Sequence, residues 1–348
     1  MRESLPPWLL PLWRGLRQRD ARLPHAILLS GPQGSGKRLF AEHLAAALVC
    51  VAPQEDGFAC GHCKACTWLA SGNHPDHFVI VPAADEAADD EAEDNGKKEK
   101  ARSTQIVIDQ VRALQAALEV GSGGHAGGRR VVLIDPAEAM NTAAANALLK
   151  SLEEPGEGVV FVLASDAPRS LLPTIRSRCQ VLEFLPPAAS EAGAWLQAQG
   201  VSNPALLGFA SGLPLAARRF SGGALTQLRS QLAADLSAVP PRDPLRLASE
   251  WEARIKLKAT QEAGFSMPDL VDWVQRWLSD GARVAAGSVP RFFADHEAAL
   301  RSIPAPIHGW LAALRDLQAH RRSATHPLNP RLYLEDLFLT VLRRLAAR

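Results

Sequence analysis

Short apolar runs alternate with segments of helical periodicity in the first half of the chain. A continuous apolar run of strand length is typical of a parallel strand that is buried on both faces. Such runs occupy residues 26–29, 78–81, 131–134, 159–165 and 181–184. Apolar positions at helical spacing lie between them, in residues 39–49, 106–120 and 141–154. Strands that alternate with helices predict an α/β fold whose parallel sheet is covered on both faces.

The pattern changes after residue 185. Leu185, Pro186 and Pro187 predict a linker, because successive prolines disfavour both a continuing helix and a paired strand. The remainder has helical patterns only, in residues 191–220, 269–278, 306–320 and 330–345. We therefore predict a sheet domain, a small helical domain and a C-terminal all-α domain, over residues 1–185, 186–221 and 222–348.

A charged insertion interrupts the predicted sheet domain at residues 83–104. It is acidic through Asp94 and basic from Lys97, and residues 85–102 contain no apolar side chain larger than alanine. Such a segment cannot bury enough apolar surface to become ordered, so we predict disorder here. The lysines also permit a nucleic-acid contact, but a solvated linker is the favoured interpretation.

Composition argues against a protein that works through its overall charge or within a membrane. Lys and Arg number 38 and Asp and Glu number 37, so no global field directs the chain to nucleic acid or to a membrane surface. The apolar runs are of strand length, too short to span a bilayer. Pro6, Pro7 and Pro11 interrupt the apolar residues within 1–16, so this start differs from a signal peptide. We expect a cytoplasmic protein with an amphipathic first element.

Four of the 5 cysteines are clustered, and their spacing predicts a metal site. Two C-x-x-C turns overlap at Cys60, Cys63 and Cys66, and Cys50 can fold back through the intervening loop. Four thiolates complete the tetrahedron of a structural zinc site, which has no open position for catalysis. His62 lies inside the first turn and is expected to face solvent. A redox dithiol and unligated buried thiols are the alternatives.

A glycine-rich turn between the first strand and the first helix predicts a phosphate loop. Backbone N–H groups, a helix N-terminus and a lysine would together surround phosphate oxygens. The candidate residues are Gly31, Gly34, Ser35, Gly36 and Lys37. The next position, where a hydroxyl would hold magnesium, is Arg38. A turn without function is the alternative interpretation.

A second departure from an active phosphate-loop enzyme follows the third strand. Asp135 ends that strand where an acid would hold magnesium through water, although a plain turn residue explains it equally well. The glutamate that would polarise the attacking water is replaced by Pro136. Together with Arg38, this predicts impaired hydrolysis and argues against bound magnesium. ATP binding is left open.

In their order and spacing, four motifs resemble those of bacterial clamp-loader subunits of the AAA+ superfamily, and among these the delta-prime family of DNA polymerase III. They are the phosphate loop, the cysteine cluster, the helix at 146–155 and the Ser-Arg-Cys triplet at 177–179. The resemblance covers residues 1–220 strongly and the remainder weakly, through 329–332. It implies an AAA+ sheet domain with a zinc module inserted at 50–66, a helical lid at 186–221 and a collar at 222–348.

The resemblance also implies a function. A stator-like subunit would help to load a sliding clamp onto primed DNA during replication, together with gamma/tau and delta subunits. Arg178 of the triplet would act in trans, as a catalytic group in the neighbouring ATPase site, although a surface salt bridge is its plain alternative. This chain would catalyse no reaction by itself. It would be part of a DNA-directed DNA polymerase holoenzyme. The rival hypotheses are an active ATPase with unusual metal coordination and a zinc-stabilised nucleic-acid-binding module.

Overall fold

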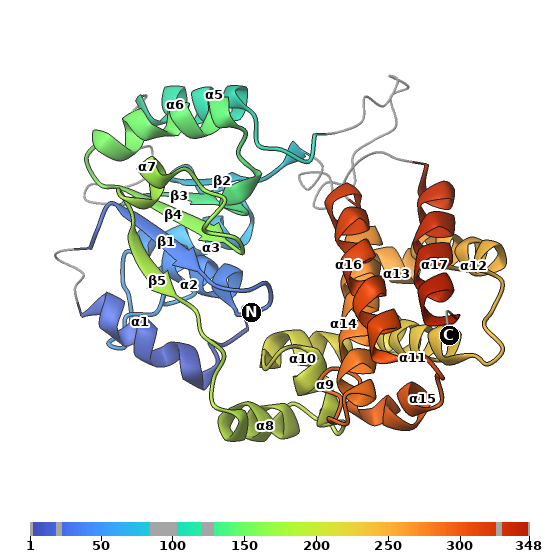
Figure 1. Ribbon diagram of the computed structural model, residues 1–348. Helices are drawn as coiled ribbons and strands as arrows, with labels where there is room; N and C mark the ends of the chain where they lie inside the picture. Colours follow the sequence, from blue (N-terminus) through green and yellow to red (C-terminus); the bar gives the residue numbers. More distant parts are fainter. Residues whose placement is uncertain (1–2, 19–22, 84–102, 120–128, 325–328, 347–348) are drawn as a thin grey trace. The chain divides into compact units, whose positions relative to one another are not determined.

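The computed structural model describes residues 3–18, 23–83, 103–119, 129–324 and 329–346 (Figure 1). The predicted insertion at 83–104 lies outside these residues except at its ends. The chain divides into two compact units, Met1–Pro186 and Pro187–Arg348, close to the predicted linker. Within the described part of the chain, no helix is both long and apolar enough to cross a membrane.

The first unit contains one sheet of five parallel strands in the order β2-β3-β4-β1-β5. Each strand coincides with a predicted apolar run to within one or two residues. The strands are β1 (Ala26–Ser30), β2 (His77–Ile80), β3 (Arg130–Ile134), β4 (Val159–Ser165) and β5 (Gln180–Glu183). Every residue of the interior strands β3 and β4 is buried, whereas the edge strands β2 and β5 are only partly buried.

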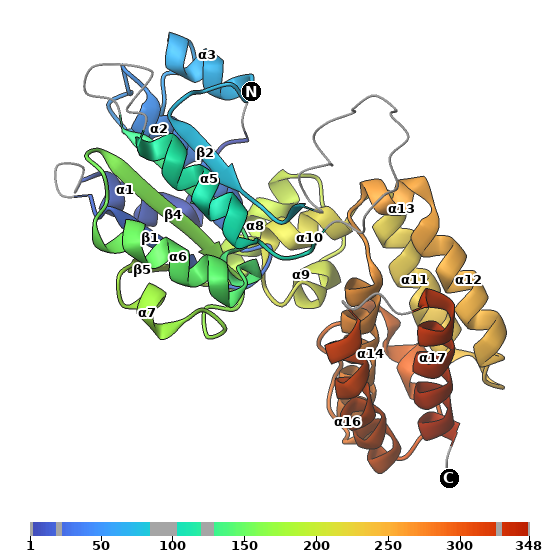
Figure 2. The ribbon, with the colours of Figure 1, turned by 90° about the horizontal axis from the view of Figure 1, so that it is seen from above.

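Alternate side chains of the strands enter two separate cores, one on each face of the sheet. Ile27 and Leu29 pack in the core that contains α1 (Leu10–Arg17) and α2 (Lys37–Val49). Their neighbours Ala26 and Leu28 point the other way, into the core that contains α5 (Ile108–Glu119) and α6 (Thr142–Glu153). Figures 1 and 2 show α5 and α6 side by side over this face. The predicted fold class is therefore confirmed.

Local signals explain where the helices of this unit begin. Asn141 caps α6 by accepting a hydrogen bond from the Ala144 amide at 2.8 Å. The amphipathic start of the chain forms a short 3-10 turn, Pro7–Leu9, and then α1. The buried Trp13 of α1 stacks on Phe58, with ring centroids 4.4 Å apart. The first element thus belongs to the core of the sheet unit. Two further helices are α3 (Lys64–Ala70) and α7 (Pro173–Arg176).

The second unit is all helical and has two hydrophobic cores. The smaller core joins α8 (Ala189–Ala198), α9 (Ala205–Phe209) and α10 (Pro214–Phe220). The larger core contains four fully buried tryptophans, Trp251, Trp273, Trp277 and Trp310. Its helices are α11 (Gly223–Ser237), α12 (Pro244–Lys256), α13 (Lys258–Glu262), α14 (Met267–Ala285), α15 (Glu297–Arg301), α16 (Ile307–Ser323) and α17 (Pro330–Ala346). Phe209 of α9 belongs to the larger core, where its ring lies 5.3 Å from that of Trp273, and Phe220 of α10 packs against both cores. Their assignment to lid and collar stays a prediction.

A buried carboxylate fastens one loop of the larger core. Asp280 of α14 has an exposed fraction of 0% and accepts hydrogen bonds from the amides of Arg291, Phe292 and Phe293 at 2.7, 2.7 and 2.6 Å. A buried carboxylate is tolerated only when such donors replace its hydration. This contact holds Phe293 in the core, where its ring lies 5.0 Å from that of Trp277.

Candidate functional site

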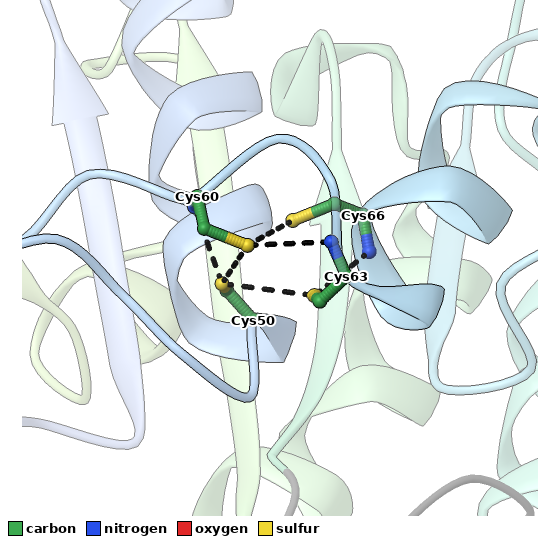
Figure 3. Close-up of side chains that lie close together, drawn as sticks. All are labelled: Cys50, Cys60, Cys63 and Cys66. Carbon is green, nitrogen blue, oxygen red and sulfur yellow. Dashed lines mark hydrogen bonds between the residues drawn. The ribbon is translucent and has the colours of Figure 1, made fainter.

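The four clustered cysteines come from the end of α2, the following loop and the start of α3 (Figure 3). Cys50 is the residue at which α2 ends, and Cys63 caps α3 by accepting a hydrogen bond from the Cys66 amide. Figure 3 shows all four sulfurs pointing toward one another. The predicted ligand set is therefore brought together by a helix end, a turn and a helix start.

The distances between the sulfurs match those of a tetrahedral site. The Sγ atoms of Cys50 and Cys60 are 3.5 Å apart, those of Cys50 and Cys63 3.9 Å, and those of Cys60 and Cys66 4.0 Å. All four lie within 4.8 Å of one another. Zinc–sulfur bonds of about 2.3 Å in a tetrahedron place the sulfurs roughly 3.8 Å apart. The cluster is thus compatible with a structural zinc ion.

Backbone amides and burial shift the pKa values of the four thiols in opposite directions. Although burial opposes the change, the amide of Cys66 lowers the pKa of Cys63 to about 6. Burial raises the pKa of Cys66 to about 12 and also raises that of Cys50. The cluster therefore contains both a thiolate and protonated thiols at neutral pH, and a metal ion would displace the remaining protons. His62 is exposed, as expected, with Nδ1 2.9 Å from the Cys60 carbonyl oxygen.

The phosphate loop connects β1 to α2, as predicted, and two of its glycines are required by its shape. Gly36 precedes α2 with φ 97°, which lies in the left-handed region that favours glycine. Gly31 packs so closely on β5 that an added Cβ would lie 2.6 Å from the carbonyl oxygen of Phe184. The conformation of Gly36 and the close packing of Gly31 therefore define the shape of the turn between β1 and α2.

Lys37 of this loop is buried and fully bonded within the protein. Its side chain is 6% exposed. Its Nζ donates to the carbonyl oxygens of Gly31 at 2.8 Å and Pro32 at 2.9 Å, and to Oδ1 of Asp166 at 2.6 Å. Ser35 Oγ lies farther away, at 3.4 Å. The lysine thus binds its own loop and a carboxylate that lies 129 residues later in the chain.

Arg38, the residue after the phosphate loop, has an exposed side chain. Its side chain is 67% exposed, and Nε lies 3.3 Å from Glu42 on the same helix. The sequence suggested a fixed positive charge at the position of a magnesium ion, but the structure places this charge on an exposed side chain. Its effect still reaches Asp135. Burial raises the pKa of Asp135, while Arg38 opposes this shift.

Sequence reasoning missed two acidic residues beside the loop. Glu138, three residues after Asp135, accepts hydrogen bonds from the amides of Asp166 and Ala167 at 2.9 and 3.2 Å. Asp166 follows β4 and pairs with Lys37. The acidic residue three positions after Asp135 in the sequence could have identified Glu138 as a candidate. The role of Asp166 could not be detected, because only folding places β4 beside β1.

Arg178 lies after α7, and the arrangement of its side chain is defined by two contacts. Nη1 donates to the Thr174 carbonyl oxygen at 2.8 Å, and Nη2 pairs with Glu153 near the end of α6. The side chain is 33% exposed, so part of the guanidinium faces solvent. Burial raises the pKa of the neighbouring Cys179 to about 11, which makes this thiol a packing group rather than a nucleophile.

Residues 14–188 match the family model described as DNA polymerase III, delta subunit. The DNA polymerase III subunit delta' of Pseudomonas aeruginosa is 40% identical to this chain over 278 residues, which cover 78% of the chain and 75% of that protein. The chain belongs to the DNA polymerase III delta' subunit family. The Escherichia coli delta' subunit is 29% identical over 96% of the chain and 94% of its own length.

More distant similarity extends beyond the delta' family. The DNA polymerase III subunit tau of Bacillus subtilis is 34% identical over 47% of this chain and 25% of its own length. A solved gamma subunit-related protein of Thermotoga maritima covers 97% of this chain and 98% of its own, at 19% identity and a TM-score of 0.44. The assignment of this delta' family member rests on the sequence matches, whose extent includes the phosphate loop and Arg178.

Proposed function

We propose that this chain is a clamp-loader subunit that supplies structure and one arginine to a neighbouring ATPase site and hydrolyses no ATP itself. The observation that carries the proposal is the bonding of Lys37, whose donors are occupied by its own loop and by Asp166. In an active phosphate-loop enzyme the equivalent lysine binds nucleotide phosphate. The membership of the delta' family supports the same role.

Two further residues argue against hydrolysis here. Arg38 replaces the hydroxyl that would coordinate magnesium, and its pairing with Glu42 supplies no alternative ligand. The glutamate that would polarise water is missing at Pro136, and the nearby carboxylate of Glu138 holds backbone amides instead. Asp135 is retained, but without the metal-binding hydroxyl and without a group to orient water the catalytic apparatus is incomplete. We therefore propose that magnesium does not bind and that the loop serves no ATPase cycle.

Arg178 is the residue that we propose acts on a neighbour. A guanidinium placed against a transferring phosphoryl group stabilises the charge that grows in the transition state. The partly exposed side chain is held by Thr174 and Glu153, so its charged end has a defined position at the surface of the sheet unit. A defined position reduces the entropy that is lost when the arginine enters the neighbouring site.

The cysteine cluster is the proposed structural zinc site of this subunit. Cys50, Cys60, Cys63 and Cys66 would hold the ion, which would fasten the loop after α2 onto α3. Four sulfur ligands leave no open position, so the ion would stabilise the fold without entering any reaction. Phe58 of the same loop stacks on Trp13, so this module also supports the first helix of the chain.

The proposed partners are the gamma/tau and delta subunits, and through the complex the sliding clamp and primed DNA. Relatives named as the delta' and tau subunits of DNA polymerase III support this assembly. The near-neutral composition of the chain favours contacts with protein partners over a general attraction to DNA. We propose a cytoplasmic location, because DNA replication takes place there.

The experiment replaces Arg178 in a reconstituted loader. We expect Arg178→Ala to leave folding and assembly nearly intact and to slow ATP turnover at the receiving site by about a thousandfold or more. The matched control is Arg176→Ala, because Arg176 is an exposed arginine at the end of α7, two residues before Arg178. Single-turnover ATP hydrolysis with clamp and primed DNA would be measured for both variants.

Two outcomes would refute the proposal. Equal rates for the two variants would remove the trans-acting role of Arg178. Phosphate release by the purified chain alone that disappears in Lys37→Ala would show that this subunit is an ATPase in its own right.

A further inference from the structure

Lys37 has no donor left for a ligand. An ammonium group carries three N–H bonds and no acceptor. Three acceptors lie within 2.9 Å of its Nζ, namely the carbonyl oxygens of Gly31 and Pro32 and Oδ1 of Asp166. A phosphate oxygen could therefore bind Lys37 only by displacing one of these groups. The two carbonyls belong to the loop itself, so Asp166 is the group that occupies the position of an external anion.

A second carboxylate holds Asp166 in place. Oε1 of Glu138 accepts hydrogen bonds from the amides of Asp166 and Ala167, which fixes the start of the loop after β4. This loop adjoins the phosphate loop, since the Gly31 amide donates to the carbonyl oxygen of Ser165, the last residue of β4. The backbone of Asp166 is thus held by the sheet and by Glu138, while its carboxylate, which is 40% exposed, is held by Lys37.

The charges around Lys37 disfavour a second anion. Asp135, Glu138 and Asp166 lie close enough for the latter two to raise the pKa of Asp135, after the larger effect of burial. Arg38, the nearest additional cation of the loop, is paired with Glu42 on α2. A triphosphate without magnesium would therefore meet three carboxylates, against Lys37, which is already paired with Asp166, and Arg38, which is exposed and paired with Glu42. Repulsion between like charges in a partly buried site is stronger than it is in water.

We propose that Asp166 is an internal anion that takes the place of nucleotide phosphate on Lys37, and that it determines the exclusion of phosphoanions from this loop. The inference rests on the proposed function in one respect, namely that this loop serves no ATPase cycle. It explains why phosphate is excluded from the loop, which the loss of the magnesium ligand alone does not explain. A loop that lacked only its metal ligand would still bind phosphate through Lys37 and the backbone amides.

The test is to remove the charge of Asp166 and measure binding of tripolyphosphate and of ATP to the full chain in EDTA. Asp166→Asn and Asp166→Ala should bind both ligands about tenfold to a hundredfold more tightly than the unmodified chain, as expected when one charge-assisted hydrogen bond no longer competes. Adding Lys37→Ala to either variant should abolish this gain. The control is Asp109→Asn, because Asp109 is an exposed acid of the same unit, 84% exposed, and its loss changes the net charge equally.

The outcomes separate this inference from the proposed function. Equal affinity of the unmodified chain and of Asp166→Asn, with both folded by circular dichroism, would refute the role of Asp166, as would a gain that persists without Lys37. A gain of similar size in Asp109→Asn would assign the effect to net charge and refute the inference too. None of these results changes the expectation for Arg178→Ala in the assembled loader, so a failure of this inference is distinguishable from a failure of the proposed function.

Discussion

Zinc binding to the cysteine cluster should release protons, and their number depends on how many of the four thiols are protonated beforehand. At pH 7.5 a thiol with a pKa of about 6 is already a thiolate, which is the case for Cys63. Cys66, with a pKa of about 12, is protonated, and Cys50, whose pKa is raised, is protonated too. The pKa of Cys60 is lowered, chiefly by a hydrogen bond from the His62 amide, so this thiol adds at most one more proton. Since a zinc ligand must be a thiolate, binding should release about two to three protons.

Calorimetry of zinc binding to the metal-free chain in buffers of different ionisation enthalpy measures this number directly. The affinity should rise between pH 6 and 9, because fewer protons must be displaced at higher pH. Metal analysis should find about one zinc ion per chain prepared without chelator. Removal of the ion should loosen the segment between Cys50 and Cys66, which amide hydrogen exchange would detect as lost protection.

Two cysteine variants decide whether the effect belongs to the cluster. Cys63→Ser should lose zinc and the associated protection. Cys179→Ser should retain both, because this thiol lies outside the cluster. Zinc binding without proton release, an affinity independent of pH, or no zinc in the freshly prepared chain would refute the reasoning.

Two further variants test contacts that the structure defines. Glu153→Gln removes the charge that holds Arg178, and because both side chains are partly exposed to solvent it should change the free energy of unfolding by only about 0–1 kcal/mol. It should still slow the reconstituted loader through a misplaced Arg178, and unchanged single-turnover rates would contradict this. Asp280→Ala leaves the amides of Arg291, Phe292 and Phe293 without their buried acceptor and should lower the unfolding free energy by about 3–5 kcal/mol in urea titrations. A loss below about 1 kcal/mol would show that water replaces the carboxylate.

The sequence by itself determined the strands, most of the helices and the cysteine cluster. Apolar runs such as 131–134 are buried on both faces in the interior of a parallel sheet, so their composition is sufficient to predict them. The cysteines could be assigned because three of them lie within one short turn and helix start, where local backbone geometry brings the sulfurs together. The glycines of the phosphate loop are likewise a local requirement.

Only the tertiary structure decided which groups the key side chains contact. Lys37 and Asp166 are 129 residues apart, and Arg178 and Glu153 are 25 apart. These pairs form because parallel strand pairing and helix packing bring chain segments together, and no local pattern encodes such a pairing. Arg38 differs from these residues, because its partner Glu42 lies four residues later on the same helix and forms a local pair. Residue types thus indicated which chemistry was available, and long-range packing determined which charges meet.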